Sequence, residues 1–350
     1  MTSIFRKGIL VSLAATGLLA VASPAQAVLL PGSNVMSTVQ YGDFAVYSLD
    51  LLEQCAGAND SRCKPSGPLP ISSNGGFTKT QLTVFTGENG GPQSTNQPEP
   101  LPNGAPGDNA FASPSGQQSS TFLMGSAFSP EPSPSFAGDQ AGKWDIKVSA
   151  LRSYLGNNDL VFIFDNSQKG DAANQWLQIW GQARVLSADG TNLLGCFELN
   201  NTSAAGCTST APAQPNGPFD FSSPYVTVFT GYCVDKVSGI AYNLGTGTAT
   251  TCANSNGYYV NGNIGSAKAD NAAYSKALND FIFAPTTAAD WVLSLDIRTA
   301  NNNGSAETLW ICSNCKVSTT TEVSEPASLA LLGVALMGGA YVSRRRSRQA

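Results

Sequence analysis

The stretch "QWLQIWGQARVL", Gln175 to Leu186, alternates apolar and polar side chains along most of its length. Successive side chains of a β-strand point to opposite faces, so this alternation predicts a strand with one face in the core. The runs Tyr225–Gly231 and Trp291–Arg298 alternate similarly, and "DLVFIFDN", Asp159 to Asn166, is a continuous apolar run typical of a strand buried on both faces. Together these runs predict a mainly β protein.

Short strand-like runs separated by Gly, Asn and Ser favour a β-sandwich-like body with one or two short helices. The helical pattern is clearest over Asp270–Phe283, where Asp270 is the expected N-cap. A weaker pattern covers Trp144–Gly156, and Gly156 is expected to end that helix. A short third helix is considered over Ser48–Gly57.

A Pro-rich stretch, residues 88–142, interrupts the strand pattern. It holds nine of the 20 prolines, a composition that does not readily continue a sheet or helix. We therefore divide the chain into a first part of the body (28–90), a Pro/Gly/Ser-rich loop or linker (91–142) and the main β body (143–318). Aromatic residues such as Phe111 and Phe122 indicate that parts of the stretch pack on the body.

The N-terminus has the three parts of a secretory signal peptide. Arg6 and Lys7 form a positive region, an apolar run extends from Gly8 to Ala22, and the A-x-A pattern of Ala25 to Ala27 follows. We expect residues 1–27 to be removed during Sec export, which leaves a mature chain that begins at Val28.

The C-terminus, residues 319–350, has the length and charge pattern of a membrane segment. Residues 326–343 carry no charge, and as a helix they would reach about 27 Å, close to the thickness of a bilayer core. Arg344, Arg345 and Arg346 follow, and arginines beside a span normally stay on the cytoplasmic side. The body would then lie outside.

This tail, "VSEPASLALLGVALMGGAYVSRRR", resembles the PEP-CTERM sorting signal of Gram-negative, exopolysaccharide-producing bacteria. The resemblance implies transient retention in the inner membrane, processing by exosortase and release to the cell surface or polysaccharide matrix. Ser324 stands where the motif usually has its first proline, which puts efficient processing in doubt. A plain C-terminal membrane anchor is the alternative. The residues that carry the resemblance are Val323, Ser324, Glu325, Pro326, Arg344, Arg345 and Arg346.

Composition excludes several classes of function. Without the two ends, which hold six of the 19 basic residues and one of the 24 acidic residues, the body carries a formal charge of −10. An acidic surface of this kind does not favour binding to nucleic acid. The chain has no histidine, which excludes Ser-His-Asp and Cys-His catalysis, and metals or haem held by histidine.

Eight cysteines in a chain predicted to be exported indicate disulfides, because the cell exterior is oxidising. Many connectivities are allowed, and we favour the most local one. It pairs Cys55 with Cys63, Cys196 with Cys207, Cys233 with Cys252, and Cys312 with Cys315. The last pair lies in "LWICSNCK", a C-x-x-C pattern, so a surface thiol oxidoreductase is an alternative.

One face of the predicted strand Gln175–Leu186 is a candidate glycan-binding strip. Its two tryptophans would stand about 13 Å apart, with amide and guanidinium donors between and beyond them. The alternative is that the tryptophans pack beneath a helix or the long loop. The strip consists of Trp176, Gln178, Trp180, Gln182 and Arg184.

Catalytic and metal sites are not assigned, and no cofactor is expected. A carbohydrate-active hydrolase would need two carboxylates that face a cleft, and no pair stands out among the acidic residues. Those considered are Asp145, Asp159, Asp165, Glu198, Asp220, Asp235, Asp290 and Asp296. Two oxygen-rich turns have ligands that calcium accepts but no calcium-loop spacing. They are Asp165, Asn166 and Asp171, and Asp296, Asn301 and Asn303.

The sequence therefore predicts an exported surface or exopolysaccharide-matrix protein with a structural or adhesive role. Exosortase, the Sec machinery and extracellular polysaccharide are its expected partners. The exported hydrolase and the thiol oxidoreductase remain the competing functions.

Overall fold

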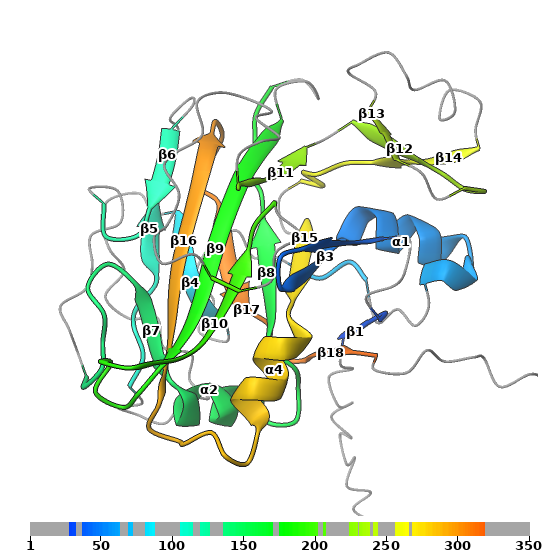
Figure 1. Ribbon diagram of the computed structural model, residues 1–350. Coiled ribbons are helices and arrows are strands. Elements are labelled where there is room, and N and C mark those ends of the chain that lie inside the picture. The colour runs from blue at the N-terminus through cyan, green and yellow to red at the C-terminus, as the bar shows by residue number, and fades with distance from the viewer. Residues whose placement is uncertain are drawn as a thin grey trace, which may run out of the picture.

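The computed structural model describes residues 28–32, 37–63, 69–72, 81–87, 106–114, 120–126, 136–170, 175–201, 206–207, 224–229, 231–238, 241–243, 256–265 and 268–318. Within these residues the chain forms four sheets and three α-helices, so the prediction of a mainly β protein is confirmed (Figure 1). The predicted signal peptide, the sorting tail, Cys252, Asp171 and Asp220 lie outside the described residues.

The largest sheet has seven strands in the order β2-β3-β15-β8-β17-β4-β5. All neighbours are antiparallel except β4 and β5, which are parallel. The strands are β2 (Thr38–Tyr41), β3 (Phe44–Ser48), β15 (Asn271–Tyr274), β8 (Val161–Asp165), β17 (Thr308–Ile311), β4 (Leu82–Gly87) and β5 (Phe111–Ser113).

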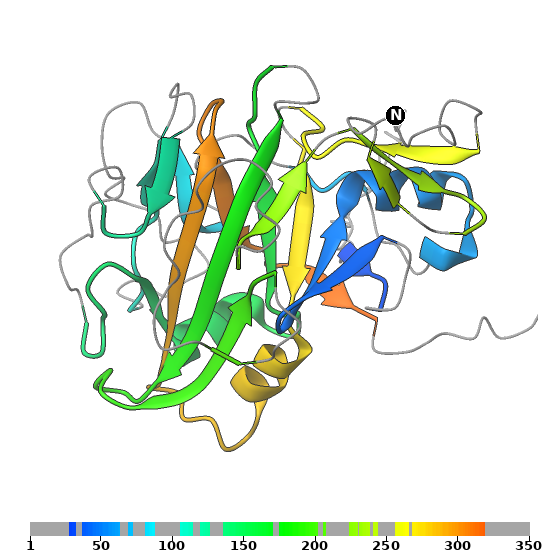
Figure 2. The ribbon, with the colours of Figure 1, turned by 45° about the horizontal axis from the view of Figure 1, so that its top comes forward.

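The second large sheet has six strands and is antiparallel throughout. Its main path is β10-β9-β16-β6, while β11 pairs with β9 and β7 pairs with β16. The two long strands β9 and β16 run side by side through the middle of the body (Figure 2). The strands are β10 (Leu193–Leu199), β9 (Trp176–Leu186), β16 (Val292–Asn302), β6 (Ser120–Leu123), β11 (Val226–Phe229) and β7 (Trp144–Lys147).

The two large sheets share one hydrophobic core. Phe162 and Phe164 of β8 pack there with apolar residues of β9 and β16, such as Ile179 and Leu295. The intervening residues of β8, including Ile163, belong to a second core on the other face of the seven-stranded sheet. The strand predicted from "DLVFIFDN" is therefore buried on both faces, as its continuous apolar run indicates.

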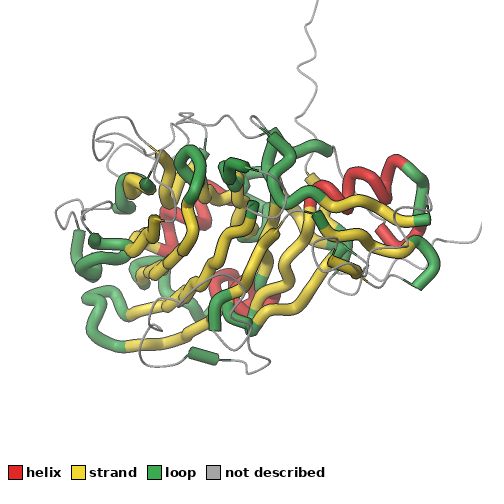
Figure 3. Tube along the Cα trace, turned by 90° about the horizontal axis from the view of Figure 1, so that it is seen from above, coloured by secondary structure: helices red, strands yellow, loops and turns green. Residues whose placement is uncertain are grey.

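The second core is covered by α1 (Leu49–Gly57) and two small sheets, which lie at one end of the molecule (Figures 1 and 3). Ser48 caps α1 by accepting a hydrogen bond from the Leu51 amide at 3.3 Å, which confirms the helix considered there. A 3-10 turn, η1 (Ser61–Cys63), follows. The small sheets consist of β13 (Ala241–Asn243), β12 (Tyr232–Asp235) and β14 (Gly257–Val260), and of β1 (Val28–Leu30) paired with β18 (Cys315–Val317).

The other two predicted helices begin later than expected. The first four residues of Trp144–Gly156 form strand β7, and α2 (Val148–Leu155) follows, ending at Gly156 with φ 58° as predicted. Similarly, β15 precedes α4 (Lys276–Phe283), and Ser275 is its N-cap instead of Asp270. Pairing with strands distant in sequence outweighs the local helical pattern in both cases.

The described parts of the Pro-rich stretch contribute to both large sheets. β5 extends the seven-stranded sheet and β6 extends the six-stranded sheet, and Phe111 and Phe122 are buried in the shared core. Among the described residues, no helix is long and apolar enough to cross a membrane.

Candidate functional site

The predicted glycan-binding strip lies on one face of β9, and most of that face is buried. Gln178 and Trp180 are 1% and 0% exposed, and Gln182 is also buried. Trp176 and Arg184, at the two ends of the strip, are half-buried. The strand is therefore present as predicted, but its polar face is buried as well as its apolar face, and only the ends of the strip reach the surface.

Trp180 belongs to a buried polar network that joins three strands. Its Nε1 donates to Oε1 of Glu198 at 2.7 Å, and the Arg298 guanidinium lies 5.6 Å from the centre of its ring. Arg298 also approaches the Asp296 carboxylate at 3.5 Å, and the Lys143 ammonium pairs with the same carboxylate. These contacts fix Trp180 in the body of the protein.

Gln178 differs from its neighbours on this face. It lies opposite Thr227 of β11 and Ala300 of β16. Both polar atoms of its side chain are buried, and neither has a hydrogen-bond partner within the described part of the chain. A buried amide without partners is costly, so this end of the strip, next to the half-buried Trp176, has unused hydrogen-bonding capacity.

Glu198 and Asp296, two of the carboxylates considered for a hydrolase, lie on the two strands that flank β9. In the strand register both residues lie opposite Gln182, one from β10 and one from β16. Both are nearly fully buried, and both accept bonds from the donors of the polar network. The hydrolase therefore stays an alternative function, although the burial of these two carboxylates gives a substrate no open cleft beside them.

The C-x-x-C pattern forms a closed disulfide. Cys312 and Cys315 are joined across a Cα–Cα distance of 5.6 Å, and both residues are buried. Asn314, between them, accepts a hydrogen bond from the Val28 amide at 2.8 Å. This disulfide thus shapes the turn on which the first described strand rests.

Three of the four predicted disulfides are present as predicted. Cys55 pairs with Cys63 and Cys196 with Cys207, in addition to the C-x-x-C pair. Cys233 is also in a disulfide, and its predicted partner lies outside the described residues.

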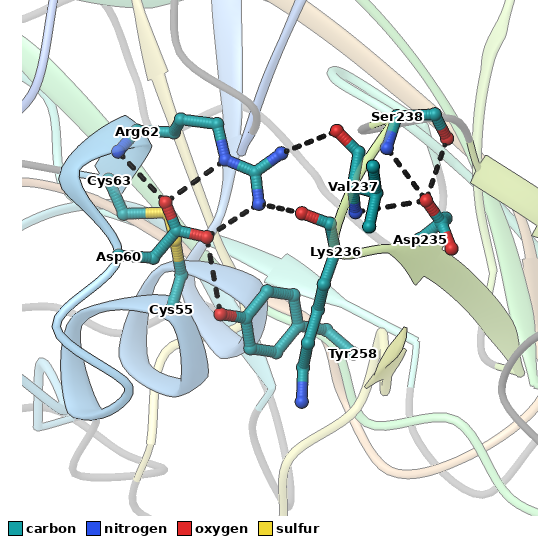
Figure 4. Close-up of polar contacts among 9 residues, drawn as sticks. All are labelled: Cys55, Asp60, Arg62, Cys63, Asp235, Lys236, Val237, Ser238 and Tyr258. Carbon is teal, nitrogen blue, oxygen red and sulfur yellow. Dashed lines mark hydrogen bonds and ion pairs between the residues drawn. A yellow bond between two sulfur atoms is a disulfide. The ribbon is translucent and has the colours of Figure 1, made fainter. Parts of the chain in front are cut away.

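A polar cluster beside the Cys55–Cys63 disulfide was not predicted (Figure 4). Arg62 binds the Asp60 carboxylate and donates to the backbone carbonyls of Lys236 and Val237. These bonds hold the pKa of Asp60 at about 2, below its usual range. The Tyr258 hydroxyl donates to the same carboxylate at 3.4 Å, so the cluster fastens α1 to the small sheet. The only feature of the sequence that could have indicated this cluster is the run Asp60-Ser61-Arg62, which lies within the loop closed by the Cys55–Cys63 disulfide.

The two turns considered for calcium lie against each other. The Lys169 amide donates to Oδ1 of Asn303 at 3.0 Å, and the Ser305 amide donates to the Ser167 carbonyl at 2.9 Å. Asn301 donates to the Trp176 carbonyl. Their polar groups therefore join the two turns to each other and to β9.

Two buried carboxyl groups lie behind these turns. Glu307 accepts bonds from the Ser167 amide at 2.7 Å and from the Gln168 side chain at 2.6 Å, and Asp270 accepts from the amides of Asn166 and Ile264. Burial raises the pKa of both carboxyl groups to about 8.

Three further carboxylates meet beside β7. One oxygen each of Asp108, Asp139 and Asp145 lies within 4.8 Å of the others. The Asp145 amide donates to Oδ2 of Asp108 at 2.7 Å, and the Gln140 amide donates to Oδ2 of Asp145 at 2.5 Å. Burial raises the pKa of Asp145 to about 7, although the Ser294 hydroxyl and the Gln140 amide favour the ionised form. Among the described residues, this is the group best suited to hold a metal ion.

The first and last described strands lie side by side. β1 and β18 are parallel, with Val28 opposite Cys315 and Leu30 opposite Val317. The Ser318 amide donates to the Leu30 carbonyl at 2.9 Å. Because the two strands are parallel, the described chain enters at one end of this pair and leaves at the other.

Comparison with known families explains the tail and leaves the activity of the body open. A family model described as "PEP-CTERM protein-sorting motif" matches residues 322–346, which confirms the resemblance found in the sequence. The motif indicates an exported protein that exosortase sorts. No curated protein and no solved structure matches the chain. A second family model matches residues 28–298, so the chain belongs to the family described as "Domain of unknown function (DUF8239)".

Proposed function

We propose that the chain is a structural or adhesive component of the cell surface or exopolysaccharide matrix of a Gram-negative bacterium. Its signal peptide would direct Sec export, and its C-terminal helix would retain it briefly in the inner membrane. Exosortase would then release the body. The role is non-covalent: a rigid β-sandwich presents side chains to polysaccharide or to neighbouring proteins.

The observation that carries this proposal is the sorting motif at residues 322–346, attached to a body closed by local disulfides. Disulfides suit a protein that works outside the cell, where thiols are oxidised. The polar network around Trp180 adds rigidity to the middle of the body, and the cluster around Arg62 adds rigidity beside α1. These features support a lasting extracellular role.

The best-supported contact for polysaccharide is the end of β9 that holds Trp176, because this side chain is half-buried and its aromatic ring can stack on a sugar. Gln178, which is 1% exposed, lies in the interior beside it. Trp180, Gln182 and Arg184 then support the strand instead of touching the ligand. This assignment narrows the predicted strip to its half-buried end.

Localisation is tested by intact mass and C-terminal peptide analysis of the protein from its host, in membrane, surface and medium fractions. We expect a chain that begins at Val28 and ends near Glu325 outside the membrane. A chain that retains Arg344 to Ala350 and stays in membranes would show that Ser324 impairs the signal.

Adhesion is tested by co-sedimentation of the purified chain with exopolysaccharide from the same host. We expect weaker binding for Trp176→Ala, with unchanged circular dichroism. Tyr259→Ala is a matched control, because this exposed aromatic residue lies on the small sheet. Unchanged binding by Trp176→Ala would refute this contact, and turnover of the polysaccharide by the unaltered chain would favour the hydrolase.

A further inference from the structure

Oδ1 of Asp145 is buried without a hydrogen-bond donor. The side chain is 0% exposed, and its other oxygen accepts the Gln140 amide. Oδ1 has no hydrogen-bond partner within the described part of the chain, although the Ser294 hydroxyl and the Asp139 carboxyl lie near enough to affect the pKa of this side chain. A buried carboxylate oxygen is normally satisfied by a donor or by a cation, so this atom indicates a missing ligand.

The two lysines nearest to Asp145 in sequence make their contacts away from the three carboxylates. The Lys143 ammonium pairs with Asp296 on β16. The Lys147 ammonium donates to the carbonyls of Ala188 and Asp290, at 2.8 and 2.9 Å. Neither of these cations therefore neutralises the carboxylates of Asp108, Asp139 and Asp145.

The spacing of the three carboxylates matches one small cation. Calcium binds oxygen ligands at about 2.4 Å, so two ligands of one ion lie at most about 5 Å apart. The three oxygens lie within 4.8 Å of one another. Two of them come from the segment that contains Asp139 and Asp145 and the third from Asp108, and carboxylate oxygens are ligands that calcium accepts.

An ion bound by these three carboxylates would have a structural role because of where they lie. Asp108 and Asp139 belong to the Pro-rich stretch, near its middle and its end, while Asp145 belongs to β7 of the six-stranded sheet. Residues 106–108 already run along β7: the Asp108 amide donates to the Asp145 carbonyl, and Gly107 bridges to Ile146. An ion here would fasten the stretch to the sheet at two points.

We propose that Asp108, Asp139 and Asp145 bind a calcium ion that fastens the Pro-rich stretch to the six-stranded sheet. The inference does not depend on polysaccharide binding or on exosortase processing. An exported protein meets calcium at millimolar concentration, so a dissociation constant of about 10⁻⁴–10⁻³ M, typical of extracellular modules, is sufficient.

The test is a calcium titration of the purified, calcium-stripped mature chain by isothermal calorimetry, with Asp139→Asn and Asp145→Asn beside the unaltered chain. Asp139 is half-buried and Asn is close in size, so at least this variant should fold. We expect each variant to bind about tenfold more weakly or worse, because ligand charge sets calcium affinity. Asp280→Asn is the control, since Asp280 is exposed and pairs with Lys276 on α4.

Hydrogen exchange measured with and without calcium places the ion. We expect slower exchange in peptides that cover residues 106–114 and 136–147 of the unaltered chain, and no change there in Asp139→Asn. Absence of calcium binding by the unaltered chain would overturn the proposal. Equal binding by both cluster variants and the control would overturn it as well, because the ion would then bind elsewhere.

Discussion

Raising the pH from about 5 to about 7 should lower the free energy of unfolding, because two buried carboxyl groups keep their protons in the folded chain. The pKa of Asp270 and of Glu307 is raised by burial to about 8, whereas unfolded carboxyl groups titrate near pH 4. Between these values the folded chain binds more protons than the unfolded chain. Their contribution to stability is therefore present at about pH 4 and is lost as the pH rises towards 8.

The magnitude follows from the number of protons. Each proton held only by the folded chain changes the free energy of unfolding by about 1.4 kcal/mol per pH unit, so these two groups give at most about 3 kcal/mol per unit. Asp145, whose pKa burial raises to about 7, adds to the slope in the lower part of this range. That is a large share of the roughly 5–15 kcal/mol that stabilises a typical domain. The chain has no histidine, so the side chain that usually dominates titration in this range is absent.

The assay is urea denaturation at several pH values between about 5 and 7, with disulfides intact and a chelator present. We expect the slope of unfolding free energy against pH to decrease by about 1.4 kcal/mol per unit in Glu307→Gln and likewise in Asp270→Asn. Asp280→Asn, on the exposed face of α4, should keep the full slope. If Glu307→Gln has the same slope as the unaltered chain, Glu307 is ionised in the folded state and the reasoning is wrong.

Three further predictions concern single contacts. Trp180→Phe removes the donor to Glu198 and should lower the free energy of unfolding by about 1–3 kcal/mol, whereas the half-buried Trp176→Phe should change it little, both measured by urea denaturation. Arg62→Ala should raise the pKa of Asp60 from about 2 towards its usual value, which NMR titration of the carboxyl group checks. The same substitution should weaken the attachment of α1 to the small sheet by about 1 kcal/mol, a small effect because the ion pair is partly exposed. The contribution of Asp60 to stability is present above about pH 4 and lost as the pH falls towards 2, so Arg62→Ala should flatten acid unfolding in that range. Cys312 and Cys315 should resist a maleimide reagent unless the chain is both reduced and unfolded, because both are buried; rapid labelling of the folded chain after mild reduction would favour the thiol oxidoreductase.

Local sequence patterns predicted the strands better than the helix boundaries. The continuous apolar run of β8 reports its burial on both faces directly, whereas the alternation of β9 located the strand but not the burial of its polar face. The segments before α2 and α4 have helical patterns, yet Trp144–Lys147 and Asn271–Tyr274 pair with strands far away in sequence. Such long-range pairing has no signal in a local window.

The candidate site shows the same limit. The sequence placed Trp176 and Trp180 on one face of a strand, and it could not tell that Glu198 and Arg298 would enclose Trp180. The carboxylates of Asp108 and Asp139 are separated in sequence by a part of the Pro-rich stretch that carries no calcium-loop spacing. Their approach to Asp145 depends on how that stretch crosses the sheet, which composition does not encode.

The pairing of β1 with β18 constrains how the body can be exported and sorted. Val28 is the first residue of β1 and Ser318 follows the last residue of β18, so a removed signal peptide and a retained tail would leave the body at opposite ends of this small parallel sheet, about 10 Å apart along the strands. Residues 319–325 separate Ser318 from the uncharged segment, and seven residues reach at most about 25 Å. Exosortase would therefore have to act close to folded protein.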